Sequence, residues 1–241
     1  MSLSSRVGRL IGLMLLVQLP TGLIVPYVLL KPLTAPPAGF LATAAGLDTL
    51  VRTCVLLLFV GGALAVAISA AAWPAVRERA PRAGLWMLAL AAANFTLQAI
   101  ENAHWLTMIS VSQAALESGA TGLETYRPIG VAVRAAWKWA HYSHILVVVG
   151  WFGALYLALF RAALLPRLLP LAGLATCGLH FIGITLPVFA GYRMPQPALF
   201  GMPLAVATLA AAFWLMARGF PAPHPAAGVR ARGVEEGPVH A

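Results

Sequence analysis

The sequence has few charged residues. Asp, Glu, Lys and Arg make up only 10% of its 241 residues, whereas hydrophobic residues make up 61%. Because soluble domains carry about 25% charged residues, this composition excludes an ordinary soluble domain and indicates a membrane protein. Among the charged residues the acidic ones are rarer, with 7 Asp and Glu against 16 Lys and Arg. The net charge of +9 does not indicate a nucleic-acid partner, because the basic residues lie between apolar segments and form no continuous stripe.

Cysteine and the common catalytic motifs are also scarce. Cys54 and Cys177 each lie in an apolar run without a second cysteine at metal-binding spacing, so we interpret both as small buried hydrophobic residues. The sequence has no Gly-x-Ser-x-Gly elbow, no Walker loop and no dinucleotide fingerprint. It therefore offers little support for nucleophilic catalysis or nucleotide binding.

Long apolar segments are what the chain has in abundance. A helix that spans a bilayer needs about 20 mostly apolar residues. Six segments qualify, and they predict an all-α fold, a six-helix transmembrane bundle over residues 1–218. The expected helices are about 7–30, 47–73, 83–110, 129–160, 168–190 and 199–217.

The ends and connections follow from the same pattern. The first apolar run continues to Leu30 without a clear cleavage site, so we expect an uncleaved helix with kinks at Pro20 and Pro26 rather than a signal peptide. We expect loops at 31–46 and 117–128. Residues 219–241 are rich in Pro, Gly, Ala and Arg, which predicts a disordered tail.

Orientation follows from the Lys and Arg residues near the helix ends, because these collect on the cytoplasmic side. The other side has three basic residues, Lys31, Arg127 and Arg193, together with Glu117 and Glu124. We therefore expect both termini to be cytoplasmic. The residues on the basic side are Arg6, Arg9, Arg77, Arg79, Arg82, Arg161, Arg167, Arg218, Arg230 and Arg232.

Polar residues interrupt two of the predicted helices at one depth. Asn94, Gln98 and Glu101 share a face of the third helix, and His104 lies on the flank of that stripe. A matching stripe on the fourth helix carries Arg134, Lys138 and His141, with His144 on its flank, and the fifth helix adds His180. Ionisable residues at membrane depth are costly and by default indicate a functional site. We expect these groups to converge in the outer half of the membrane.

Two chemistries compete for these residues. Glu101 and His104 form a Glu-x-x-His, a spacing that supplies ligands in di-iron helix bundles, and His141 and His144 form a His-x-x-His. Three histidines with a carboxylate would also suit zinc. His104, His141, His144 and His180 would allow bis-histidine haem ligation. Against a metal, only one carboxylate is available, and Lys138 and Arg134 would repel a cation. Alternatively, Glu101 pairs with Lys138 or Arg134 while the histidines form hydrogen bonds between helices.

Three functional hypotheses follow. The leading one is a membrane protein with an outward-facing intramembrane pocket that binds a small amphipathic or lipid-like ligand, hydrophobic or anionic. Its binding residues would be Gln98, Glu101, Arg134, Lys138, His141 and His144. The second is a metal- or haem-dependent enzyme that uses Glu101, His104, His141, His144 and His180. The third is a structural or accessory subunit. A transporter is less attractive, because six spans without an internal repeat would require an oligomer.

Several short motifs resemble a known family. Residues 164–169 (LLPRLL), Pro203 and residues 213–220 (FWLMARGF) resemble the turn and the closing pattern of the bacterial domain of unknown function family 4386, and Glu101 and His144 fit its polar positions. The resemblance covers about residues 5–220. It implies six membrane helices, here in a bacterial cytoplasmic membrane, and no mechanism. Thr208 stands where many members have Glu, and Gln98 where an Arg often precedes the third-helix Glu.

Overall fold

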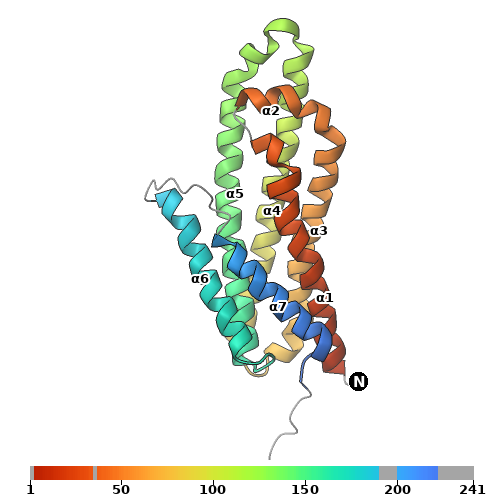
Figure 1. The fold of residues 1–241 in the computed structure, drawn as a ribbon, viewed down its shortest axis with the longest axis vertical. Coiled ribbons are helices and arrows are strands. Elements are labelled where there is room, and N and C mark those ends of the chain that lie inside the picture. Colours follow the sequence, from red (N-terminus) through yellow and green to blue (C-terminus); the bar gives the residue numbers. More distant parts are fainter. Residues whose placement is uncertain (1–2, 35–36, 190–199, 222–241) are drawn as a thin grey trace, which may run out of the picture.

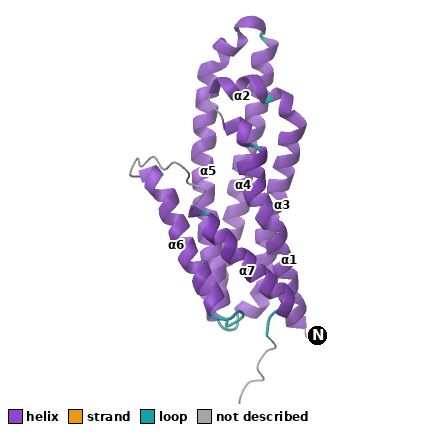
Figure 2. Cartoon of the chain, in the orientation of Figure 1, coloured by secondary structure: helices purple, strands orange, loops and turns teal. Residues whose placement is uncertain are grey.

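The computed structural model describes residues 3–34, 37–189 and 200–221, and within these ranges the chain is helical with no strand (Figures 1 and 2). This agrees with the predicted all-α fold. The main helices are α1 (Leu3–Ile24), α3 (Asp48–Val76), α4 (Pro81–Glu117), α5 (Gly122–Arg161), α6 (Leu168–Phe189) and α7 (Met202–Arg218). The short elements are a π-helical turn at Val25–Leu29, 3-10 turns at Lys31–Thr34, Ala45–Leu47 and Gly119–Thr121, and α2 (Pro37–Thr43).

Five helical segments are long and apolar enough to cross a membrane. They are Leu3–Leu29, Ala45–Val76, Pro81–Glu117, Gly122–Arg161 and Leu168–Leu186. The protein is therefore a multi-pass membrane protein. The predicted sixth span corresponds to α7, which has 17 residues and extends about 26 Å at 1.5 Å per residue. It is shorter than the other five segments.

Two expected loops are largely helical. The segment predicted as a loop at 117–128 contributes the last residue of α4, a 3-10 turn and the first turns of α5, so Pro128 lies inside a helix. A proline beyond the first turn removes one backbone hydrogen bond and crowds the carbonyl of the preceding turn, and α5 nevertheless continues through Pro128 to Arg161. The other expected loop, at 31–46, forms α2 and the two flanking 3-10 turns.

The hairpin of α4 and α5 is the longest part of the bundle (Figure 1). The two helices have 37 and 40 residues, or about 55 and 60 Å, against about 30 Å for the hydrocarbon core of a bilayer. The short helix α2 packs against both α4 and α5, toward the end of the hairpin where the two helices connect (Figure 1). It is fixed there by Ser112, whose Oγ donates to Leu41 O at 2.7 Å and accepts from Ala45 N at 3.0 Å.

The other end of the bundle, away from the α4–α5 connection, contains the α3–α4 and α5–α6 turns (Figure 1). The start of α1 and the end of α7 lie at the same end. Arg79 in the α3–α4 turn donates from Nη1 to Ala162 O after α5 at 2.9 Å, and Arg9 of α1 donates from Nη2 to Ala217 O of α7 at 3.3 Å. The described arginines of the predicted basic side thus lie at one end of the bundle. Arg230, Arg232 and most of the predicted tail lie outside the described residues.

Buried apolar side chains form two clusters along the bundle. One joins α1, α3, α4, α5, α6 and α7 around Trp151 and Tyr156, and the other joins α2 to α3 and α4 around Trp105. In the first cluster α1 and α7 approach closely at Gly12. A Cβ at this position would lie only 2.7 Å from Ala212 O, so the approach requires a glycine. Cys54 and Cys177 are free and buried, as the sequence indicates.

Candidate functional site

A buried carboxylate on α4 bridges two histidines of α5. Glu101 is 3% exposed. Its Oε1 lies 2.8 Å from His141 Nδ1 and its Oε2 lies 2.7 Å from His144 Nδ1. Both histidines reach the same carboxylate because residues three apart on a helix are neighbours on its surface. A carboxylate oxygen accepts, so each histidine donates from Nδ1 and presents its Nε2 away from Glu101.

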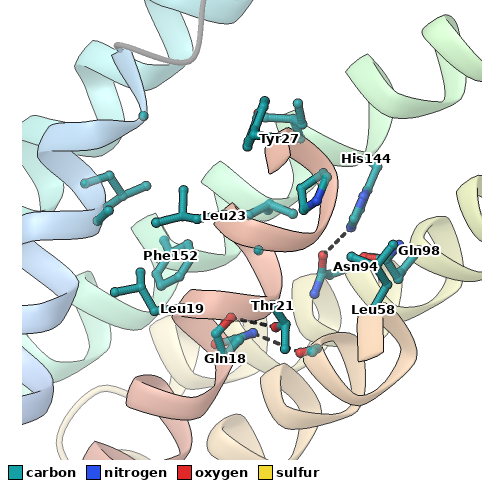
Figure 3. A pocket seen from close by; sticks show the side chains of 18 of the residues that line it. Gln18, Leu19, Thr21, Leu23, Tyr27, Leu58, Asn94, Gln98, His144 and Phe152 are labelled. Carbon is teal, nitrogen blue, oxygen red and sulfur yellow. Dashed lines mark hydrogen bonds between the residues drawn. The ribbon is translucent and has the colours of Figure 1, made fainter. Parts of the chain in front are cut away.

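The network extends from His144 to a second α4 residue. His144 Nε2 lies 2.9 Å from Asn94 Oδ1, an interaction drawn in Figure 3. His144 therefore has hydrogen-bond partners at both ring nitrogens, Glu101 at Nδ1 and Asn94 at Nε2. We refer to Glu101, His141, His144 and Asn94 as the Glu101 network. The network lies where α4 faces α5.

The Glu101 network forms one wall of a cavity of about 430 Å³. Helices α1, α3, α4, α5, α6 and α7 all contribute to the lining, which is mostly apolar. Figure 3 shows Leu19, Leu23, Leu58 and Phe152 around this space, with Asn94 and His144 on the α4–α5 side. His141 has an 18% exposed side chain and also lines the cavity. Its Nε2 has no hydrogen-bond partner among the described residues.

Two further cavity residues have buried polar atoms without a partner in the described part of the chain. These atoms are Gln18 Oε1 on α1 and His180 Nδ1 on α6. The amide nitrogen of Gln18 donates to Gly61 O at 3.0 Å. An unpaired buried polar atom costs about 1–3 kcal/mol, and both of these atoms are inaccessible to a water molecule, so the cavity itself does not supply their partners.

A family model described as Domain of unknown function (DUF4386) matches residues 10–219. The chain belongs to this family. No curated protein and no solved structure matches it. Glu101 and His144, through which the sequence resembles the DUF4386 pattern, are directly hydrogen-bonded to each other in the fold.

The two positions at which this DUF4386 chain departs from the family pattern make other contacts. Gln98 donates from Nε2 to Asn102 Oδ1 at 3.0 Å on the same helix. Asn102 Nδ2 in turn donates to Val55 O at 3.3 Å, so Asn102 connects α4 to α3 and Gln98 orients it. Thr208 lies 3.0 Å from Tyr156 through their hydroxyl groups and lines the cavity. Neither residue bonds to Glu101.

The structure brings together four of the six predicted binding residues. Gln98, Glu101, His141 and His144 all line the cavity. Arg134 and Lys138 do not: Arg134 donates from Nη2 to Thr34 O at 2.6 Å, and Lys138 Nζ lies 5.0 Å from the Trp139 ring centroid. Glu101 pairs with the two histidines instead, so the alternative in which it pairs with Lys138 or Arg134 is wrong.

The direction of α5 explains this difference. Helical side chains lean toward the N-terminus of their helix. The N-terminus of α5 lies at the far end of the hairpin from the basic turns, so Arg134 and Lys138 extend away from Glu101. Lys138 is exposed, and its cation also approaches the Tyr142 ring at 5.9 Å.

The predicted metal ligands do not assemble. Within the described residues, no three His, Cys, Asp or Glu side chains are grouped so that they could hold a metal ion. His144 uses both nitrogens in hydrogen bonds, and His104 is half-buried on α4 outside the cavity lining. His180 lines the cavity from α6. The donor set therefore fits a hydrogen-bonding site better than a metal or haem site.

Gln18 and Tyr27 are lining residues that the sequence reasoning missed. Gln18 is the only amide in the predicted first span, and this isolation is a signal that would have identified it. Tyr27 follows Pro26 in the π-helical turn, where the helix deviates from a regular α-helix. Aromatic residues are common at membrane interfaces, so Tyr27 carried no distinctive signal.

Proposed function

We propose that this protein binds a small amphipathic or lipid-like molecule in the cavity, with the polar end of the molecule against the Glu101 network. The observation that carries the proposal is the combination of a mostly apolar cavity of about 430 Å³ with a histidine nitrogen in its lining, His141 Nε2, that has no partner among the described residues. Ligand sites typically have about 300–1,000 Å³ and a small number of placed polar groups in an apolar lining.

The Glu101 network also joins α4 to α5, as a purely structural role requires. A structural role accounts for the hydrogen bonds of Glu101 to both histidines. It does not account for the cavity beside them or for the Nε2 of His141, which is unpartnered among the described residues. Ligand binding accounts for all of these features with one set of residues.

We further propose six spans with both termini in the cytoplasm of a bacterium. The arginine-rich end would then be cytoplasmic by the positive-inside rule, and α7 would be the sixth, short and oblique span. Measured along α4 from Arg82, Glu101 lies about 28 Å away at 1.5 Å per residue. This distance puts the Glu101 network close to the outer boundary of the hydrocarbon core, so the ligand would enter from the outer leaflet.

Lipid analysis of a cavity-filling variant tests the proposal. Val148 lines the cavity and is half-buried, so Val148→Phe reduces the space for a ligand. Val206→Phe makes the same change at a 64% exposed position of α7 and serves as the control. Native mass spectrometry of detergent-purified protein is expected to show a bound amphiphile in the wild type and in Val206→Phe, and a large loss in Val148→Phe. Equal amounts in all three proteins would refute the proposal.

A further inference from the structure

The Nε2 of His141 is a free polar atom in the cavity lining. His141 lies against Glu101 through Nδ1, and its Nε2 has no hydrogen-bond partner in the described part of the chain. The Nε2 of a neutral imidazole whose Nδ1 carries the hydrogen is an acceptor. A ligand that pairs with it must donate a hydrogen bond.

Glu101 is the one carboxylate among the described residues of the cavity lining, and both of its oxygens are occupied by the histidines. One carboxylate can balance at most one imidazolium, and a second positive charge would be uncompensated in a mostly apolar cavity, which is costly. At least one of the two rings is therefore neutral. His144 has partners at both nitrogens, so His141 is the ring with a nitrogen left for a ligand.

No cation is available in this part of the cavity for an anionic ligand. The described lining residues include no Lys and no Arg. Arg134 bonds Thr34 O, and Lys138 lies over Trp139 on the exposed side of α5. A carboxylate or phosphate head group would therefore be buried without a partner charge, beside a carboxylate that is already present.

From these contacts we infer that the cavity selects a neutral amphiphile with a hydroxyl head group. The O–H of the ligand donates to the Nε2 of a neutral His141 ring, and its apolar body fills the space between α1, α5 and α7. The ligand class comprises long-chain, prenyl or polycyclic alcohols rather than fatty acids or phospholipids. This inference rests on the proposed function and narrows its ligand.

Head-group selectivity is tested with three photoreactive probes on the full chain in lipid nanodiscs. Each probe has the same sixteen-carbon chain with a mid-chain diazirine and ends in a hydroxyl, a carboxylate or a methyl ether. The alcohol is expected to label the cavity about tenfold more than the ether or the acid, the difference that one net hydrogen bond to a buried acceptor supplies. The ether is the critical control, because it keeps the size and neutrality of the alcohol but cannot donate.

Variants assign the selectivity to its residue. His141→Phe removes the acceptor, so labelling by the alcohol should fall to the level of the ether. His141→Gln keeps an amide donor for Glu101 and an oxygen acceptor, so it should restore most of the preference. Lys138→Met alters a cation outside the cavity and should leave the selectivity unchanged. If His141→Phe does not fold, the comparison of the alcohol with the ether on the wild-type protein still decides the head group.

The outcomes separate this inference from the proposed function. Labelling by the acid or the ether that equals labelling by the alcohol overturns the hydroxyl assignment and leaves a less selective lipid site. Labelling by all three probes that is insensitive to Val148→Phe refutes the lipid site itself. An unchanged alcohol preference in His141→Phe shows that the acceptor is not the one proposed.

Discussion

Two sets of buried polar contacts join α5 to its neighbours, and they differ in what they leave free. Trp151 Nε1 donates to Ser69 Oγ at 2.9 Å, and Ser69 in turn donates to Ala65 O at 2.8 Å. Trp151 and Ser69 therefore use both of their polar side-chain hydrogens within the protein. The Glu101 network instead leaves His141 Nε2 beside a cavity. The comparison separates contacts that hold helices together from contacts that orient a group toward a ligand.

Removing the central carboxylate should have the largest effect. Glu101→Leu leaves two histidine donors without their acceptor in a buried site. Each unsatisfied buried donor costs about 1–3 kcal/mol of unfolding free energy, so thermal unfolding in detergent should show a much lower Tm. Glu117→Leu makes the same change at the exposed end of α4 and should leave the Tm nearly unchanged. Equal Tm values for the two variants would contradict the role assigned to Glu101.

His141 should affect ligand binding more than it affects the fold. His141→Phe removes one of two hydrogen bonds to Glu101 but leaves His144 and Asn94 in place. We expect about a tenfold loss of alcohol binding, equivalent to about 1.4 kcal/mol, with a smaller decrease in Tm than in Glu101→Leu. Titration of the variant in nanodiscs measures the first effect and thermal unfolding the second. A large decrease in Tm with unchanged affinity would place His141 with the structural contacts instead.

The Ser69 contact should show the opposite pattern. Ser69→Ala leaves the buried Trp151 N–H without its acceptor. Hydrogen bonds between membrane helices contribute about 0.6 kcal/mol on average and at most about 1.7, so the Tm should decrease modestly while ligand affinity is retained. Ser143→Ala, at an exposed serine of α5 that bonds only to its own helix at Trp139 O, is the matched control. Loss of ligand binding in Ser69→Ala but not in Ser143→Ala would contradict the purely structural role assigned to the Ser69 contact.

Lys138 should show the smallest effect. The sequence suggested it as a binding residue, but its Nζ lies over the rings of Trp139 and Tyr142 and its side chain is exposed. Lys138→Met should therefore change alcohol affinity by less than about twofold, well below the roughly 1.4 kcal/mol of a tenfold change. Arg134→Gln removes the charge of the other basic residue that lies outside the cavity lining, and it should also leave the affinity nearly unchanged. A strong loss of binding in Lys138→Met would show that its ammonium group reaches the ligand.

The general architecture could be predicted because it depends on features that the sequence states directly. Continuous apolar runs identified a helical membrane protein, and the short motifs at 164–169 and 213–220 identified the family. The segment at 117–128 was misread because its glycines and Pro128 resemble loop signals, whereas packing continues the α4–α5 hairpin through them. Local composition cannot report on that packing.

The polar site was only partly predictable. Helical periodicity correctly put Glu101 and the two α5 histidines on facing stripes, because that geometry follows from residue spacing. It could not exclude Lys138, which shares the stripe of His141, because the outcome depends on the direction in which a long side chain leans. Gln18 lies on α1, far from these residues in sequence, and only the tertiary fold brings it to the cavity.

The position of bound ligand tests the central claim most directly. The sixteen-carbon alcohol probe can be photoactivated in nanodiscs and its attachment sites mapped by mass spectrometry. The proposed site predicts labels on residues that line the cavity, such as Ile145 and Val148 of α5 and Leu204 of α7, with competition by unlabelled alcohol. Labels confined to exposed residues that face the surrounding lipid, such as Leu56 and Val206, would contradict it.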